Sequence, residues 1–567
     1  MKLDLRAVAA LALTATVLAL LSAREVRGYA HEVHRDFFDL AFEGRPENAR
    51  QVTPPDAAGL EAFRRFVYQR AAQNARFRGR WPSEASFDAA AFKDLLQLNP
   101  AAQVVALDVV PAGRGTDVRT VVREGSVDPD LDLRNQNRLL VRGGQVALDP
   151  FGRAVPYDPR TVDFGSLTGI ASQYDAHGAM LRSGEKRDSF MTAIRHPEQF
   201  ARPAEVLGSA PEFTESYAEL AMIAKLWGGP GAEWLALSFG GNALHGIEDV
   251  GNQIHTTQIG TWKFWWDAKR HRFALKLKRM FKRVPDPAGY TAPSSLTPQQ
   301  VDDALARIET GQTDQVDKQL LFALGREPKG FPTDREFGVL IIGAHHRLVE
   351  DFVQDLYLES RDALRAGQPQ RARPEVVELL RRAKAGDKAF EDRCRAALRR
   401  AGLGTATPGE TPYGKVLTEV MVEASAPEAQ AIYEAIRAIS KPELKQGGNY
   451  HHTLGHKPLD FVTATEPSNE DVRTIWDLNG RAFARVVTAV RLWDEVFAAE
   501  TAGVTPGSPA ALDRAGKIVD RLVAAQLDRL EAAEQRRAAY LDQKQREWQE
   551  LQRPKEGLWQ KLRGWFR

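Results

Sequence analysis

The sequence has one cysteine in 567 residues, almost no net charge and a single long apolar run. One cysteine, Cys394, excludes an intramolecular disulfide and a thiolate-rich metal site, so any metal has to be held by histidine, aspartate and glutamate. A formal net charge of +2 gives no global attraction to nucleic acid or anionic lipid, which leaves only local basic segments to consider. With 43% hydrophobic residues, the chain can bury a large core.

The apolar run lies at the N-terminus. Residues 1–23 have the pattern of a secretory signal peptide, in which Lys2 and Arg6 precede an apolar segment (7–21) and Ala23 offers a small residue at the cleavage point. The sequence therefore predicts an exported protein that is periplasmic, secreted or attached to a membrane surface. An uncleaved anchor is the alternative, although the run is short for a span of ~20 residues.

Helical spacing of apolar residues dominates the rest of the chain and predicts a mainly α protein. The stretches QVVALDVV, RTVVREG and QVALDPFG, between residues 100 and 160, could be short strands or extended loops. The segments with helical spacing are 31–43, 56–75, 212–228, 231–255, 299–324, 337–365, 373–402, 411–440, 468–500 and 510–550.

The most informative motif is ALHGIEDVGNQIH, in which His245, Asp249 and His255 follow a His-x3-Asp-x5-His spacing. Four positions place His245 and Asp249 on one face of a helix, where an imidazole nitrogen and a carboxylate oxygen can bind the same cation. His255 could serve a neighbouring ion. A ligand set of histidine and carboxylate favours zinc, with manganese or iron as alternatives.

Further candidate ligands lie before and after this motif. His34 occurs in GYAHEVHRDFFDLAF, Asp163 and His177 are fourteen positions apart, and His346 and Glu350 occur in AHHRLVEDF. His346 and Glu350 repeat the four-residue spacing of His245 and Asp249 and therefore predict a second pair on one helix face.

Three neighbouring residues compete with these candidates. Asp175, in QYDAH, could take the role of Asp163. His31 or His345 could hydrogen-bond to the ligands and orient them without binding the metal. The residues alone leave these alternatives open.

In the order of its motifs the chain resembles the α-helical zinc-dependent phospholipase C family and its relatives, the zinc-dependent single-strand nucleases. The resemblance is carried by scattered motifs between about residues 29 and 360. It implies a multi-helix bundle with inserted loops, up to three zinc ions and hydrolysis of a phosphodiester bond.

The resemblance also implies a role for each ligand. Asp163 would complete one zinc site and also orient or deprotonate the attacking water. The remaining implied roles are Asp249 bridging two zincs, His245 and His177 on one of them, His34 on the other, and His255, His346 and Glu350 on the third.

The chain departs from the family pattern at three points. Gln253 stands where the family usually has a proline, two positions before the last histidine of the central motif. The family uses the amino group of its first mature residue as a zinc ligand, and cleavage after Ala23 would leave Tyr29 internal. The interval between His255 and His346 is 91 positions, whereas the family spacing is short.

This long interval contains a basic, tryptophan-rich segment. Residues 261–284 hold nine Lys and Arg against Asp267 alone, next to Trp262, Trp265 and Trp266. Basic residues with indole rings suit a phospholipid surface, and single-stranded nucleic acid could use the same chemistry. The rings could also pack into the helical core while the charges are solvated.

Together these features predict a zinc-dependent phosphodiester hydrolase, with a phospholipase C acting on membrane phospholipids favoured. A single-strand nuclease and a non-catalytic helical envelope protein that keeps the fold are the alternatives. Residues 366–375 (AGQPQRARPE) have the composition of a linker. The expected parts of the chain are a signal peptide (1–23), a phospholipase C-like catalytic domain (29–365) with an insertion at about 260–335, a C-terminal helical region (376–550) and a basic aromatic tail (551–567).

Overall fold

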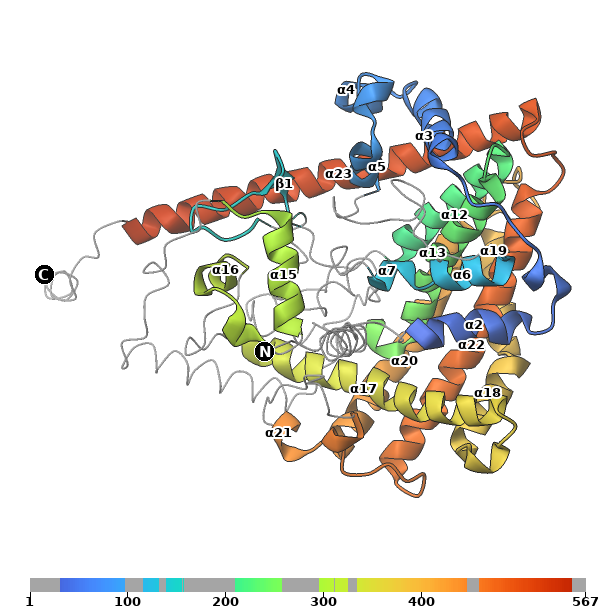
Figure 1. Cartoon of the computed structure of the whole chain (residues 1–567), viewed down its shortest axis with the longest axis vertical. Coiled ribbons are helices and arrows are strands. Elements are labelled where there is room, and N and C mark those ends of the chain that lie inside the picture. The colour runs from blue at the N-terminus through green and yellow to red at the C-terminus, as the bar shows by residue number, and fades with distance from the viewer. Residues whose placement is uncertain are drawn as a thin grey trace, which may run out of the picture.

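The structure is a computed structural model, and the residues it describes are 31–96, 116–131, 139–155, 157, 210–256, 295–309, 312–324, 334–445 and 458–552. In this part of the chain the fold is mainly α, as the sequence predicts (Figure 1). The only sheet among these residues is a hairpin of β1 (Val141–Arg142) and β2 (Gln145–Val146). None of the described helices is long and apolar enough to cross a bilayer.

Several predictions concern residues outside this description. They are the signal peptide (1–23), Asp163, Asp175 and His177, the basic segment 261–284 and the terminal residues 553–567.

The N-terminal part consists of short helices that end before residue 132. They are α2 (His31–Phe42), η1 (Pro46–Ala49), α3 (Ala57–Ala71), α4 (Ala75–Arg80), η2 (Glu84–Ser86), α5 (Ala89–Leu95), α6 (Val118–Gly125) and α7 (Asp128–Leu131).

The middle part carries the two central helices and the elements up to the predicted linker. These elements are α12 (Ala210–Trp227), α13 (Ala232–Gly251), η4 (Gln253–His255), α15 (Pro298–Glu309), η6 (Thr313–Gln315), α16 (Lys318–Ala323) and α17 (Asp334–Arg365).

The C-terminal part contains the longest helices. Its elements are η7 (Pro369–Arg371), α18 (Pro374–Ala385), α19 (Lys388–Arg400), α20 (Tyr413–Ile439), α21 (Pro442–Lys445), η8 (Pro458–Phe461), α22 (Glu470–Thr501) and α23 (Pro509–Gln552).

Helix α13 is the centre of the molecule. Nearly all of its residues are buried, as expected for a helix that is apolar or small around its whole circumference. It packs against α12, α6, α20 and α22. The turn that reverses the chain between α12 and α13 is WGGPG, in which Gly228 and Gly231 adopt φ values of 65° and 72° that only glycine adopts readily.

One hydrophobic core joins the helices on both sides of residues 366–375. It runs from Val33 in α2 to Ala533 in α23 and includes side chains of α13, α20 and α22. Helix α23 packs along α12 and the short helices α3, α4 and α5, and it runs past the main bundle in Figure 1. The C-terminal helices are therefore part of the same packed body as the N-terminal ones.

The segment RTVVREG is helical, so the extended structure considered for it is wrong. Asp117 accepts a hydrogen bond from the backbone N–H of Thr120 and so caps the N-terminus of α6. Val118, Val121 and Val122 then fall on one face of the helix and are buried. The stretch QVALDPFG does contain a strand, β2.

A second, smaller hydrophobic cluster lies apart from the main core. It combines Leu139 and Val146 around the hairpin with Val301 of α15 and Leu321 of α16. Backbone hydrogen bonds from Val146 to the carbonyl of Leu296 and from Ala154 to that of Ala323 tie the two segments together, at 2.7 Å each. Part of the expected insertion thus packs with residues 139–155.

Candidate metal centre

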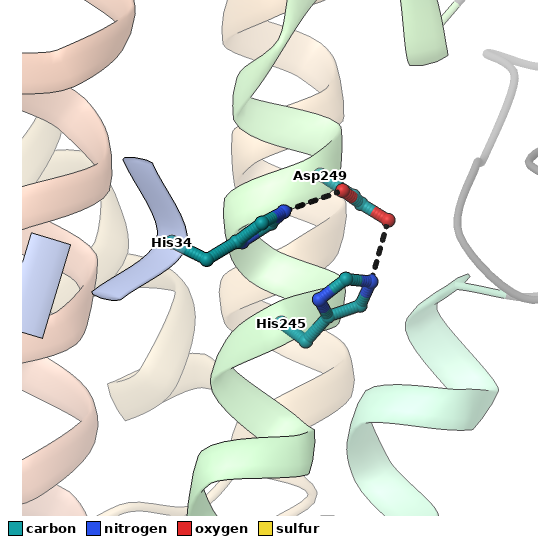
Figure 2. Close-up of side chains that lie close together, drawn as sticks. All are labelled: His34, His245 and Asp249. Atoms are coloured by element: carbon teal, nitrogen blue, oxygen red, sulfur yellow. Dashed lines mark ion pairs between the residues drawn. The ribbon is translucent and has the colours of Figure 1, made fainter. Parts of the chain in front are cut away.

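Helices α2 and α13 bring His34, His245 and Asp249 together in the interior (Figure 2). Asp249 Oδ2 is 3.0 Å from His245 Nε2, and its other oxygen, Oδ1, is 3.5 Å from His34 Nε2. One donor atom from each of the three side chains lies within 4.8 Å of the others, and all three side chains are fully buried. These are three of the ligands that the sequence predicts.

The Nδ1 atom of each imidazole, which points away from Asp249, is also hydrogen-bonded. His34 Nδ1 lies 2.6 Å from Glu248 Oε2, and His245 Nδ1 donates to the backbone carbonyl of Ser126 at 2.7 Å. A ring that donates from Nδ1 presents a lone pair at Nε2, which is the atom that faces Asp249 in both cases. The rings stack with centroids 4.5 Å apart.

A close approach of α6 to α13 puts the Ser126 carbonyl in place. A Cβ atom on Gly241 would come within 2.5 Å of the Val122 carbonyl oxygen, and one on Gly125 within 2.7 Å of the Ser238 carbonyl oxygen. Only glycines allow the two backbones to lie this close. Ser126, the C-cap of α6, is fully buried beside α13 as a result.

The opposite face of α2 is fixed by ion pairs with α17. Asp36 accepts hydrogen bonds from Tyr357 Oη, Arg361 Nη1 and Arg365 Nη2 at 2.7–2.9 Å, and its side chain is almost fully buried. Burial, together with the charge of Asp36, raises the pKa of Tyr357 well above its ordinary value, so the phenol remains a donor. This cluster holds α2 in the rotation that points His34 inward.

A second pair of predicted ligands meets near the end of α13. His255 Nε2, in η4, lies 3.1 Å from Glu350 Oε1 in α17, although 95 positions separate the two residues. Asn252 Nδ2 donates to the same carboxylate oxygen at 3.3 Å. His346 belongs to α17 one turn before Glu350, but its side chain lies outside the described structure. His345 is buried next to the Tyr433 ring.

Glu248, Ser126 and Asn252 contact the candidate ligands and were not predicted from the sequence. Glu248 carries the clearest signal, because ALHGIEDVG places a second acidic residue beside Asp249 in an otherwise apolar helix. A buried carboxylate needs a partner, and its neighbours in the motif are histidines. Ser126 contributes only its backbone carbonyl, which every residue type has, so the sequence could not indicate this role.

A large cavity among the described residues lies elsewhere. It has a volume of about 1080 Å³, is lined by α2, α6, α17 and α18, and contains none of the candidate ligands. Its cations are engaged, since Arg119 pairs with Asp39 and Lys384 with Glu43.

The donor set of the His34, His245 and Asp249 cluster fits a divalent metal ion. Imidazole nitrogens and carboxylate oxygens are ligands of zinc, and the hydrogen bonds to Glu248 and Ser126 are the contacts that orient metal-binding imidazoles. The fold and these side chains together define a helical protein with a buried histidine–aspartate cluster of metal-ligand composition. Comparison with known proteins gives no match to a family model, to a curated protein or to a solved structure.

Proposed function

We propose that the protein is an exported, metal-dependent phosphodiester hydrolase that acts as a phospholipase C on membrane phospholipids. The observation that carries this proposal is the convergence of the His34 and His245 Nε2 atoms on the two oxygens of Asp249. Zinc is the favoured metal because the donors are imidazole and carboxylate, with no thiolate among them.

Asp249 would hold metal together with both imidazoles, because each of its oxygens faces a different one. His255 and Glu350 would hold a further ion, together with His346. Zinc held by these residues would lower the pKa of a bound water and would stabilise charge on a phosphoryl oxygen.

Side chains of the protein would orient the metal ligands and the attacking water. Glu248 and Ser126 would keep each Nε2 directed at its ion. Asp163 would orient the attacking water or accept its proton, and His177 would complete the same zinc site.

Metal analysis tests the ligand cluster. Protein purified without chelators should retain at least about one zinc per chain, and Asp249→Asn should lose it because the charge of the carboxylate is gone. Asp494→Asn, which changes a half-exposed carboxylate of α22, is the control and should bind zinc as the unchanged protein does. A wild-type protein that folds with substantially less than one zinc would refute the cluster, since buried ion pairs would then account for its geometry.

Substrate assays separate the three functional alternatives. Release of phosphocholine or phosphoethanolamine from phospholipid vesicles would support the phospholipase C. Digestion of single-stranded DNA without headgroup release would support the nuclease instead. Bound metal with neither activity would support the non-catalytic envelope protein.

A further inference from the structure

The turn that carries His255 is anchored by a buried glutamine. Gln253, the first residue of η4, is fully buried, and its amide Nε2 donates to Glu428 Oε2 of α20 at 3.1 Å and to the Leu478 carbonyl of α22 at 2.9 Å. Both amide hydrogens are thus used, each on a different helix. One side chain therefore ties the turn to two helices of the C-terminal part.

The acceptor of this glutamine is itself held rigidly. Arg485 donates to both oxygens of Glu428, at 2.9 and 2.7 Å, and Arg481 Nη1 lies 3.1 Å from Glu428 Oε1. A two-pronged contact between a guanidinium and a carboxylate fixes the orientation of the carboxylate as well as its position. Glu428 is consequently a fixed point to which Gln253 can bind.

The described backbone hydrogen bonds of this turn are short-range, from the N–H groups of Asn252, His255 and Thr256 to carbonyls three residues earlier. After α13 ends at Gly251, the chain makes only a three-residue 3-10 helix, which lacks the continuous ladder of an α-helix. Ser425 of α20 donates to the Gly251 carbonyl at 3.4 Å, and Thr256 Oγ1 donates to the Gln253 carbonyl at 2.7 Å. Side chains, more than helical hydrogen bonds, determine where the imidazole of His255 lies.

We infer that Gln253 is a positioning residue of the proposed metal centre, which acts by fixing the turn so that His255 Nε2 faces Glu350. The inference rests on the proposed function, because it treats His255 and Glu350 as ligands of an ion. It assigns a role to α20 and α22 as well. Through Glu428 and Leu478 these helices supply the frame for one metal site, although they contribute no ligand to the pairs described above.

The test compares two buried glutamines. Gln253→Met keeps the length of the side chain but removes the amide, and Gln526→Met does the same in α23, where Gln526 is also buried and donates to Ser216 Oγ at 2.5 Å. Zinc binding is measured by competition with a chromophoric chelator, alongside the unfolding midpoint. Gln253→Met should weaken binding of about one equivalent of zinc roughly tenfold and leave the remaining zinc unchanged, whereas Gln526→Met should lower stability alone.

Two further variants separate positioning from stability. Gln253→Asn keeps the amide on a side chain one methylene shorter, which cannot reach both acceptors, and it should give a smaller loss of zinc affinity if Gln253→Met fails to fold. Glu428→Gln keeps an acceptor oxygen for Gln253 but loses the charge with which Arg485 holds that oxygen in place, so for a similar loss of stability it should lower zinc affinity less than Gln253→Met does.

The outcomes distinguish this inference from the proposed function. A wild-type protein that binds no zinc overturns the proposed function. A wild-type protein that binds zinc, with Gln253 variants that bind it equally well, overturns the inference alone. Loss of zinc affinity in proportion to stability across all four variants would also overturn it, because the role of Gln253 would then be structural only.

Discussion

Glu248 illustrates how a single carboxylate can control a neighbouring ligand. Its carboxylate accepts a hydrogen bond from Nδ1 of His34, which leaves Nε2 as the nitrogen with a lone pair for a metal. We therefore predict that Glu248→Gln lowers zinc affinity about 10–100-fold while the protein still folds, because the amide keeps the volume but not the charge. Competition titration with a chelator measures this, and the exposed Glu423→Gln is the control. Equal affinities in the two variants would contradict the assigned role.

Two glutamates of α12, Glu215 and Glu219, have buried carboxyl groups. The side chain of Glu215 is partly accessible along its stem, but its carboxyl is buried, and it accepts a hydrogen bond from the backbone N–H of Lys415. Burial, reinforced by the charge of Glu219, raises the pKa of Glu215 to about 8. Burial also raises the pKa of Glu219 to about 7, in spite of its ion pair with Arg521.

These raised pKa values predict that stability falls as the pH rises from about 5 to about 8. Between about 4.5, the ordinary pKa, and the raised values, the folded protein binds more protons than the unfolded chain, so the free energy of unfolding falls as pH rises. Glu215→Gln cannot ionise, so its unfolding midpoint should fall less than that of the wild type between about pH 5 and about pH 8. Glu423→Gln should follow the wild-type curve. Parallel curves for wild type and Glu215→Gln would refute the prediction.

At the scale of elements, the contact between α6 and α13 links packing to the candidate metal centre. Gly241→Ala would push a Cβ against the Val122 carbonyl and move Ser126 away from His245. We expect a loss of about 1–3 kcal/mol in unfolding free energy from overpacking, together with weaker zinc binding. Denaturant unfolding and zinc titration measure the two effects.

The matched control is another helical glycine with open space around it. A Cβ atom added to Gly79 in α4 would have no other atom within 4 Å, so Gly79→Ala should raise stability by about 0.5–1 kcal/mol through helix propensity. Zinc binding should not change. If Gly241→Ala behaved in the same way, the close approach of α6 would not matter to the site.

Element boundaries show what local sequence can and cannot predict. The spacing over 373–402 predicts one helix, but the chain forms two, α18 and α19. The break occurs because Gly386 adopts a φ of 75° and because the Asp387 side chain accepts a hydrogen bond from the N–H of Phe390, which caps the N-terminus of α19. Long periodic segments such as 411–440 and 468–500 match α20 and α22 closely, and the helical spacing of apolar residues continues through Pro427 inside α20. A glycine followed directly by an aspartate is the local signal for the break at Gly386.

The candidate site was predictable to a similar extent. Helical spacing alone places His245 and Asp249 on one face, as found. The proximity of His34 came from the resemblance in motif order, because no local pattern joins residues so far apart. Ser126 and Gln253 could not be predicted, since their roles depend on how α6, α20 and α22 are rotated against α13.

At the scale of the whole molecule, the shared core determines whether a fragment of the chain can fold on its own. Helices α20 and α22 pack on α12, α13 and α2, so a fragment that ends at Arg365 would expose the apolar surface of the central helices. We predict that a fragment of residues 29–365 does not fold on its own and binds no zinc at the affinity of the full chain. Circular dichroism, limited proteolysis and zinc titration test this. A cooperative, protease-resistant fragment would show that the N-terminal part is an independent domain.

The contact between α2 and α22 also has a consequence for synthesis. Arg491 donates to the backbone carbonyls of Leu40 and Ala41, which precede it by about 450 positions. His34 therefore leaves the ribosome long before the helix that secures α2 has been translated. The packing around α2 is therefore complete only after α22 has emerged, and on the proposed function a metal would be bound after nearly the whole polypeptide has been translated.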